Sequence, residues 1–168
     1  VLNSMLTRIR HRGPNEAGIY ISEGVGLGSV RLSILDLATG QQPLCDETGR
    51  YWITFNGEIF NYRELRMDLE KRGCRFRTHS DTEVLLVAYR EYGVDCLRML
   101  NGQFAFAIWD TQKKYMFLAR DGVGVKPLYF TENQKGFLFS SELKGILQES
   151  SVSRELDHTS LHNYLTYL

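Results

Sequence analysis

The sequence is poor in cysteine, in net charge and in long apolar runs. Its three cysteines, Cys45, Cys74 and Cys96, are an odd number at spacings that suit neither a disulfide framework nor a zinc site. Because 20 basic residues balance 20 acidic ones, no net field favours nucleic acid or anionic lipid. No stretch approaches the roughly 18 apolar residues of a transmembrane helix. These absences predict a protein of the reducing cytoplasm that binds neither nucleic acid nor membranes.

The chain also lacks the usual arrangements of metal ligands and nucleophiles. Of its four histidines, only His158 and His162 have a regular spacing, and a helix surface explains that spacing better than a metal site. None of the three cysteines is flanked by a base or a sharp turn that would activate its thiol. We therefore expect no metal in this chain and no nucleophile.

The residues that are present predict one globular domain with two stacked sheets. With 43% apolar residues, a chain of 168 residues can bury a sizeable core. Apolar spacing predicts helices, and alternation predicts strands, in this order: helix 2–9, strands within 16–36, strand 51–55, helix 61–73, helix from 80, a helical piece 94–100, strand 103–110, strand 115–121 and hairpin 127–141. Two helices between groups of antiparallel hairpins indicate an α+β fold in which helices cover stacked sheets, a four-layer arrangement.

The first candidate site residue is Arg31. In the expected strand it lies on the face opposite Val30, Leu32 and Ile34. Its planar guanidinium suits bidentate binding of a carboxylate. From spacing alone, a solvated strand arginine is the more common explanation.

A second candidate is the Asn56-Gly57-Glu58 segment that follows the strand expected at Tyr51–Phe55. Asn-Gly is a strong signal for a hairpin turn. However, a helical pattern follows it in place of a returning strand, which weakens that interpretation. A side-chain amide and a glycine N–H close together can instead donate two hydrogen bonds to one oxyanion.

Two further segments carry charged groups. Asp81 follows Ser80, whose hydroxyl can cap the next helix, and an acid in the first helical turn has a structural explanation of its own. In RDGVGVKPLYF, Arg120, Asp121 and Lys126 surround two glycines. The spacing does not fit a phosphate-binding loop, and we expect an internal ion pair there.

Seven motifs follow one another along nearly the whole chain: RHRGPNEAGIY, GSVRLSILDL, FNGEIFNY, SDTEVLL, LNGQFAFAIWD, RDGVGVKPLYF and SSELKGIL. Together they resemble the class II glutamine amidotransferase domain of glutamine-hydrolysing asparagine synthetases. The resemblance implies an N-terminal-nucleophile hydrolase fold, which is an αββα sandwich of antiparallel sheets. In that family an N-terminal cysteine, activated by its own α-amino group, attacks the side-chain amide of glutamine. Ammonia leaves, and the thioester is hydrolysed to glutamate.

The resemblance also implies a role for each candidate residue. Asn56, through its side chain, and Gly57, through its N–H, are similar to the oxyanion hole. Arg31 is similar to the arginine that holds the α-carboxylate of glutamine, and Asp81 and Glu58 look like the acids that bind its α-ammonium. Backbone groups around two more residues would orient the substrate, namely Leu32 and Ile34.

The resemblance implies a division at residue 147. Residues 1–147 would form the glutaminase domain, without its first strand and its cysteine, and 148–168 a linker and the start of a synthetase domain. We expect a truncated chain that cannot itself hydrolyse glutamine. L-glutamine and the synthetase domain in cis are the expected partners, and a homodimer is left open. We expect no cofactor in this domain, whereas the synthetase domain would use ATP and Mg to amidate aspartate.

Two other functions remain open. The chain could be a non-catalytic amidotransferase-like module for binding or assembly, or an amidotransferase of the same family that acts on a different carboxylate. Glucosamine-6-phosphate synthase and phosphoribosyl-pyrophosphate amidotransferase fit less well, because the segment around Arg31 reads SVRLSILD and not a Thr-Arg-Trp/Tyr-type stretch.

Overall fold

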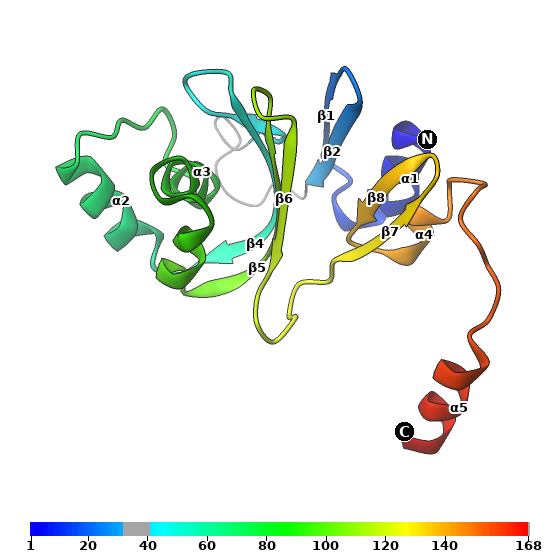
Figure 1. The fold of residues 1–168 in the computed structure, drawn as a ribbon. Coiled ribbons are helices and arrows are strands. Elements are labelled where there is room, and N and C mark those ends of the chain that lie inside the picture. The colour runs from blue at the N-terminus through cyan, green and yellow to red at the C-terminus, as the bar shows by residue number, and fades with distance from the viewer. Residues whose placement is uncertain (32–40, 168) are drawn as a thin grey trace.

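The computed structural model describes residues 1–31 and 41–167 (Figure 1). Leu32 and Ile34 lie outside these described residues. The helices are α1 (Leu2–Ile9), α2 (Tyr62–Lys71), α3 (Asp81–Tyr92), α4 (Leu143–Ile146) and α5 (His158–Tyr167), with 3₁₀ turns at Arg10–Arg12 and Gly93–Met99. The strands are β1 (Glu16–Ser22), β2 (Val25–Arg31), β3 (Leu44–Cys45), β4 (Tyr51–Ile59), β5 (Gly102–Asp110), β6 (Tyr115–Arg120), β7 (Tyr129–Asn133) and β8 (Gly136–Ser140).

These elements form four layers (Figure 1). Helices α2 and α3 cover one face of an antiparallel sheet with the strand order β3-β4-β5-β6. The hairpins β1-β2 and β7-β8 lie on the other side of this sheet, and α1 and α4 form the outermost layer. The predicted α+β class and the αββα sandwich are confirmed.

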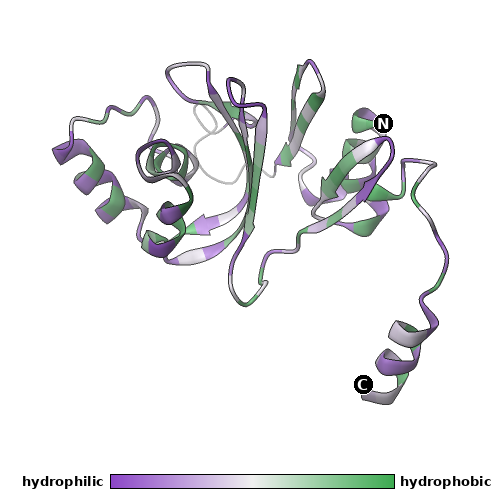
Figure 2. Ribbon diagram, in the orientation of Figure 1, coloured by the Kyte–Doolittle hydropathy of each residue, from purple (hydrophilic) through white to green (hydrophobic). Residues whose placement is uncertain are grey.

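Strand β5 is buried on both faces, as its sequence predicts. Phe104, Phe106 and Ile108 belong to the core under α2 and α3, and Ala105 and Ala107 point to the hairpin layer. Helix α2 is amphipathic, and Figure 2 shows both hydrophobic and hydrophilic residues on it. The main core therefore lies between the central sheet and helices α2 and α3.

The central strand is longer than the sequence predicts. We expected it to end at Phe55, but β4 continues through Asn56 and Gly57 to Ile59, paired with β5 throughout. Asn56-Gly57 therefore forms no turn, although this dipeptide is a strong hairpin signal. Pairing with a distant strand outweighs the local turn preference of Asn-Gly here.

The ion pair expected in the loop after β6 is also wrong. The Asp121 carboxylate accepts hydrogen bonds from the main-chain N–H groups of Phe104, Val125 and Lys126, at 3.2, 2.9 and 3.1 Å. No ion pair of Asp121 occurs within the described residues. Burial alone would raise the pKa of Asp121, but these N–H groups outweigh it and lower the pKa to about 2.

The C-terminal helix α5 follows an extended segment and packs on nothing in the described part of the chain. Leu161 and Leu165 on it are 39% and 70% exposed. No helix within residues 1–31 and 41–167 is long and apolar enough to cross a membrane. The expected boundary after residue 147 stays a prediction.

The N-terminus of α3 is held by a buried acid. Ser80 caps the helix as predicted, since its hydroxyl accepts the N–H of Glu83 at 3.2 Å. The Glu83 carboxylate, only 4% exposed, accepts the N–H groups of Arg77 and Thr78 at 2.9 and 2.6 Å. It also accepts the Thr78 hydroxyl at 2.7 Å. The loop in front of Asp81 is therefore fixed.

We expect Glu83→Ala to lower the free energy of unfolding by about 2 to 4 kcal/mol, because it leaves several buried donors without an acceptor. Denaturant titration measures this loss. The matched control is Glu70→Ala, which removes an exposed pair with Arg66 and should cost at most about 1 kcal/mol. Equal losses of unfolding free energy in Glu83→Ala and Glu70→Ala would contradict a stabilising role of the buried Glu83 carboxylate.

Candidate active site

Asn56 points away from the helices and into a cavity between the sheet layers. Along β4, Ile53 and Ile59 belong to the helix-side core, so Asn56 lies on the other face together with Thr54. Both line a cavity of about 460 Å³. The amide nitrogen Nδ2 of Asn56 is shielded from solvent and has no hydrogen-bond partner within residues 1–31 and 41–167. Buried donors are rarely left in this state, so this amide is available to a water molecule or a ligand atom in the cavity.

The N–H of Gly57 points to the open edge of β4. Phe60 donates its N–H to Asn101 in the chain before β5, so even-numbered residues of β4 point their N–H groups toward β5. Odd-numbered Phe55 and Ile59 instead donate to side chains on the opposite edge. By the same alternation the Gly57 N–H points to that edge, and none of the hydrogen bonds found among the described residues involves it.

Gly57 has to be glycine at this position. Its φ is +154°, and an added Cβ would collide with the main-chain oxygen of Gln103 on β5. The close approach of the two backbones therefore keeps the donors of residues 56 and 57 next to each other.

Two carboxylates lie at the end of this strand. The Asp81 side chain accepts the Ile59 N–H at 3.0 Å, which places the start of α3 against the edge of β4. Burial raises the pKa of Asp81, the N–H groups of Ile59 and Thr82 oppose this rise, and the nearby charge of Glu58 adds to it. Glu58 is exposed. A cation bound between these acids would relieve their repulsion.

Arg31 lines a different, polar cavity of about 480 Å³. It ends β2, where an added Cβ on Gly13 would collide with its main chain, and its guanidinium lies 3.9 Å from the Glu16 carboxylate. Ser29 lines both cavities, so the two adjoin. The structure thus brings Asp81 of α3 close to the end of β4, which carries Asn56, Gly57 and Glu58. Arg31 lies in the hairpin layer, on β2.

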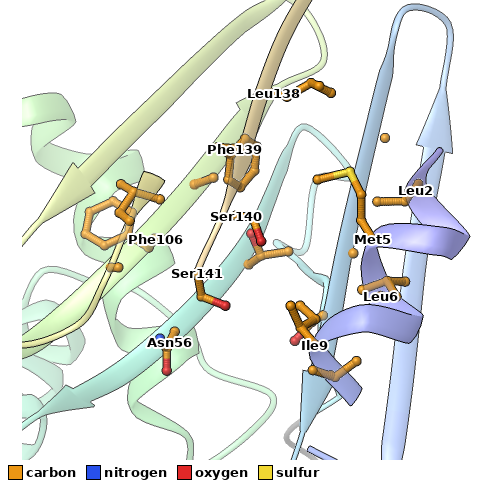
Figure 3. A pocket seen from close by; sticks show the side chains of 18 of the residues that line it. Leu2, Met5, Leu6, Ile9, Asn56, Phe106, Leu138, Phe139, Ser140 and Ser141 are labelled. Carbon is orange, nitrogen blue, oxygen red and sulfur yellow. The ribbon is translucent and has the colours of Figure 1, made fainter. Parts of the chain in front are cut away.

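The cavity that holds Asn56 is a groove between two hairpins. Figure 3 shows Asn56 on one side, Leu2, Met5 and Leu6 of α1 on the other, and Phe139 of β8 between them. β2 pairs with β1 and β8 pairs with β7, so each has a second edge that no described strand covers. An extended chain could add to both edges.

The three cysteine thiols have raised pKa values, which disfavours the thiolate form. Burial raises the pKa of Cys96 to about 11 and is the largest cause of the raised pKa values of Cys45 and Cys74. All three thiols are free. Residues 1–31 and 41–167 hold no cluster of three or more acidic, His or Cys side chains that could bind a metal ion.

Sequence reasoning missed two residues at this site, Gln42 and Thr82. Gln42 lines the Arg31 cavity, accepts the Phe55 N–H at 2.7 Å and donates to the Thr82 hydroxyl at 3.5 Å. Gln42 lies in an irregular loop without periodicity, and Thr82 is one more polar residue in a helical turn. No local pattern distinguishes either one.

The four-layer sandwich of helices on stacked antiparallel sheets is the architecture of N-terminal-nucleophile amidotransferases. The chain matches the family model described as glutamine amidotransferase domain over residues 1–168, and it belongs to this family. It is 44% identical over 167 residues to asparagine synthetase (glutamine-hydrolysing) 1 of Bacillus subtilis, covering 99% of the chain and 26% of that protein. A putative asparagine synthetase (glutamine-hydrolysing) of Mycobacterium tuberculosis is 41% identical, with 93% and 26% covered. The chain spans about a quarter of the length of these relatives.

Solved structures support the fold. Glutamine phosphoribosylpyrophosphate amidotransferase of B. subtilis, complexed with ADP and GMP, superposes with a TM-score of 0.66 at 24% identity, covering 85% of this chain and 39% of that one. A structure described as the allosteric regulatory enzyme of purine biosynthesis gives a TM-score of 0.68 at 24% identity, with 86% and 39% covered. At this identity the likeness establishes the architecture alone.

Asp81→Asn tests the cost of the buried charge. Because the folded pKa of Asp81 is raised above its unfolded value of about 3.9, the ionised group costs stability at higher pH, and the cost vanishes as the carboxyl becomes protonated. The variant keeps an oxygen for the Ile59 N–H. We expect its free energy of unfolding at pH 7 to equal or exceed that of the wild type by up to about 1 kcal/mol, with the difference disappearing below about pH 4.

Urea titrations across this pH range measure the difference. Ser80→Ala is the control, since loss of the helix cap should cost about 1 kcal/mol at every pH. A loss of more than about 1 kcal/mol in Asp81→Asn at pH 7 would show that the charge stabilises the fold.

Proposed function

We propose that this chain is the glutaminase domain of an asparagine synthetase and releases ammonia from L-glutamine. The observation that carries the proposal is the Asn56 amide, a shielded donor without a described partner, beside the outward N–H of Gly57. Two such donors would bind the oxyanion that forms when the glutamine amide is attacked. The alternative of a non-catalytic binding module gives no reason for this pair.

The surrounding charges fit the other end of glutamine. Arg31 would pair with the α-carboxylate, and Asp81 with Glu58 would hold the α-ammonium. Because Arg31 lies in the hairpin layer and the acids at the central sheet, the bound amino acid would span both layers. Its side-chain amide would then reach the donors of Asn56 and Gly57.

The groove between β2 and β8 would hold the nucleophile. An extended segment with a terminal cysteine would add to both open strand edges and pack its apolar side chains on Leu2, Met5 and Leu6. Its thiolate would attack the amide carbon, and the C–N bond would break as the nitrogen takes a proton and leaves as ammonia. Water would then cleave the thioester to glutamate and the free thiol.

The relatives suggest the use of the ammonia. They carry the name asparagine synthetase, so the acceptor we propose is the aspartate carboxylate, activated with ATP and Mg in a synthetase domain in cis. The three free thiols fit a reducing cytoplasm. The function is tested in the protein that contains this domain and its flanking segments, by glutamate release from glutamine. No release would overturn the proposal.

Asn56→Ala tests the oxyanion donor. We expect glutamine-dependent kcat to fall by about 10² to 10³-fold, which corresponds to roughly 2.7 to 4 kcal/mol of barrier, with a smaller change in KM. Asparagine formation from added ammonia should be retained, because it bypasses glutamine. The matched control is Asn133→Ala at the β7–β8 turn, an asparagine with only surface contacts. Similar kcat values for all three proteins would remove Asn56 from the mechanism.

Arg31→Ala tests the carboxylate site. Loss of a charge-assisted pair should raise the glutamine KM by about 10 to 150-fold, equivalent to roughly 1.5 to 3 kcal/mol. Arg98→Ala, which removes an exposed cation paired with Asp95, serves as the control and should leave KM unchanged. Steady-state kinetics separate the two. An unchanged KM in Arg31→Ala would exclude the proposed contact.

A further inference from the structure

The carboxamide of Gln42 connects the two halves of the candidate site. Its Oε1 accepts the Phe55 N–H at 2.7 Å, one residue before Asn56, and its Nε2 donates to the Thr82 hydroxyl at 3.5 Å, one residue after Asp81. From this bridge we infer that Gln42 is a positioning residue, which keeps the donors of Asn56 and Gly57 aligned with the acid at the start of α3. The inference rests on the proposed function and adds a residue to it.

The edge of β4 shows why such a residue is needed. Strand β3 pairs only with Trp52 and Ile53, so the rest of this edge has no neighbouring strand among the described elements. Gln42 accepts the N–H of Phe55, and Asp81 accepts that of Ile59. Between them the N–H of Gly57 stays available. The two side chains thus take the place of a strand on either side of the donor.

The main chain of Gln42 lies against the hairpin layer. An added Cβ on Gly18 of β1 would collide with the Gln42 carbonyl oxygen, so the loop rests directly on the hairpin layer. The side chain meanwhile lines the cavity of Arg31. Gln42 therefore contacts the hairpin layer, β4 and α3, which are the three parts that carry the proposed substrate contacts.

The distances indicate which half of the bridge matters more. The bond to the Phe55 N–H is short, whereas the bond to Thr82 is near the limit for a hydrogen bond. A carboxylate at position 42 could still accept from the Phe55 N–H, and it would have to accept from the Thr82 hydroxyl instead of donating to it. A methionine could do neither, although its length is similar.

The experiment compares Gln42→Met and Gln42→Glu in the protein that contains this domain and its flanking segments. We expect Gln42→Met to lower glutamine-dependent kcat by about 10 to 100-fold with less than about 3-fold change in KM, because small displacements of catalytic donors are costly. Gln42→Glu should restore kcat to within about 3-fold of the wild type, since it retains the acceptor. Asparagine formation from ammonia should be unchanged throughout.

The matched control is Gln112→Met, the same chemical change at an exposed turn, which should leave kcat unchanged. Wild-type kcat in Gln42→Met, equal losses in Gln42→Met and Gln42→Glu, or a parallel loss of ammonia-dependent activity would overturn the positioning role. If the wild type itself releases no glutamate, the proposed function fails. That result is distinct from a failure confined to the Gln42 variants.

Discussion

The antiparallel pairing of β4 with β5 is the constraint on which the site depends. It fixes the direction of every side chain and N–H group of β4, so Asn56 must face the groove and Gly57 must donate to the open edge. The same pairing permits only glycine at position 57. Two donors with different chemistry are therefore held together by the backbone of one strand, before any ligand binds.

The second constraint is that the candidate site residues lie in two different layers. The central sheet and its helices form the apolar core and carry the donors and Asp81, whereas the hairpin layer carries Arg31. The Tyr20 ring of β1 and the Trp52 ring of β4 stack across the two layers with centroids 3.9 Å apart. An amino acid that contacts both layers must fit the distance between them.

Periodicity and capping predicted α1, α2, α3, the hairpins and the α+β architecture, because these depend on local patterns. The family motifs pointed to Asn56 and Gly57, but not to their place within a continuous strand. That continuity comes from β5, far along the chain, and overrides the turn preference of Asn-Gly. The hydrogen bonds of Asp121 and Gln42 were not predicted, for a related reason. Their partners are main-chain N–H groups, which the sequence alone does not place.

The pairing of β4 with β5 also has a consequence for the order of folding. Ile59 pairs with Gly102 and Tyr51 with Asp110, and α2, α3 and a 3₁₀ turn lie in the intervening chain. Closing so long a loop costs entropy before the strands gain contacts, so the local α2–α3 contacts should form first. The register of β4, and with it the geometry of the Asn56 and Gly57 donors, would then be acquired late.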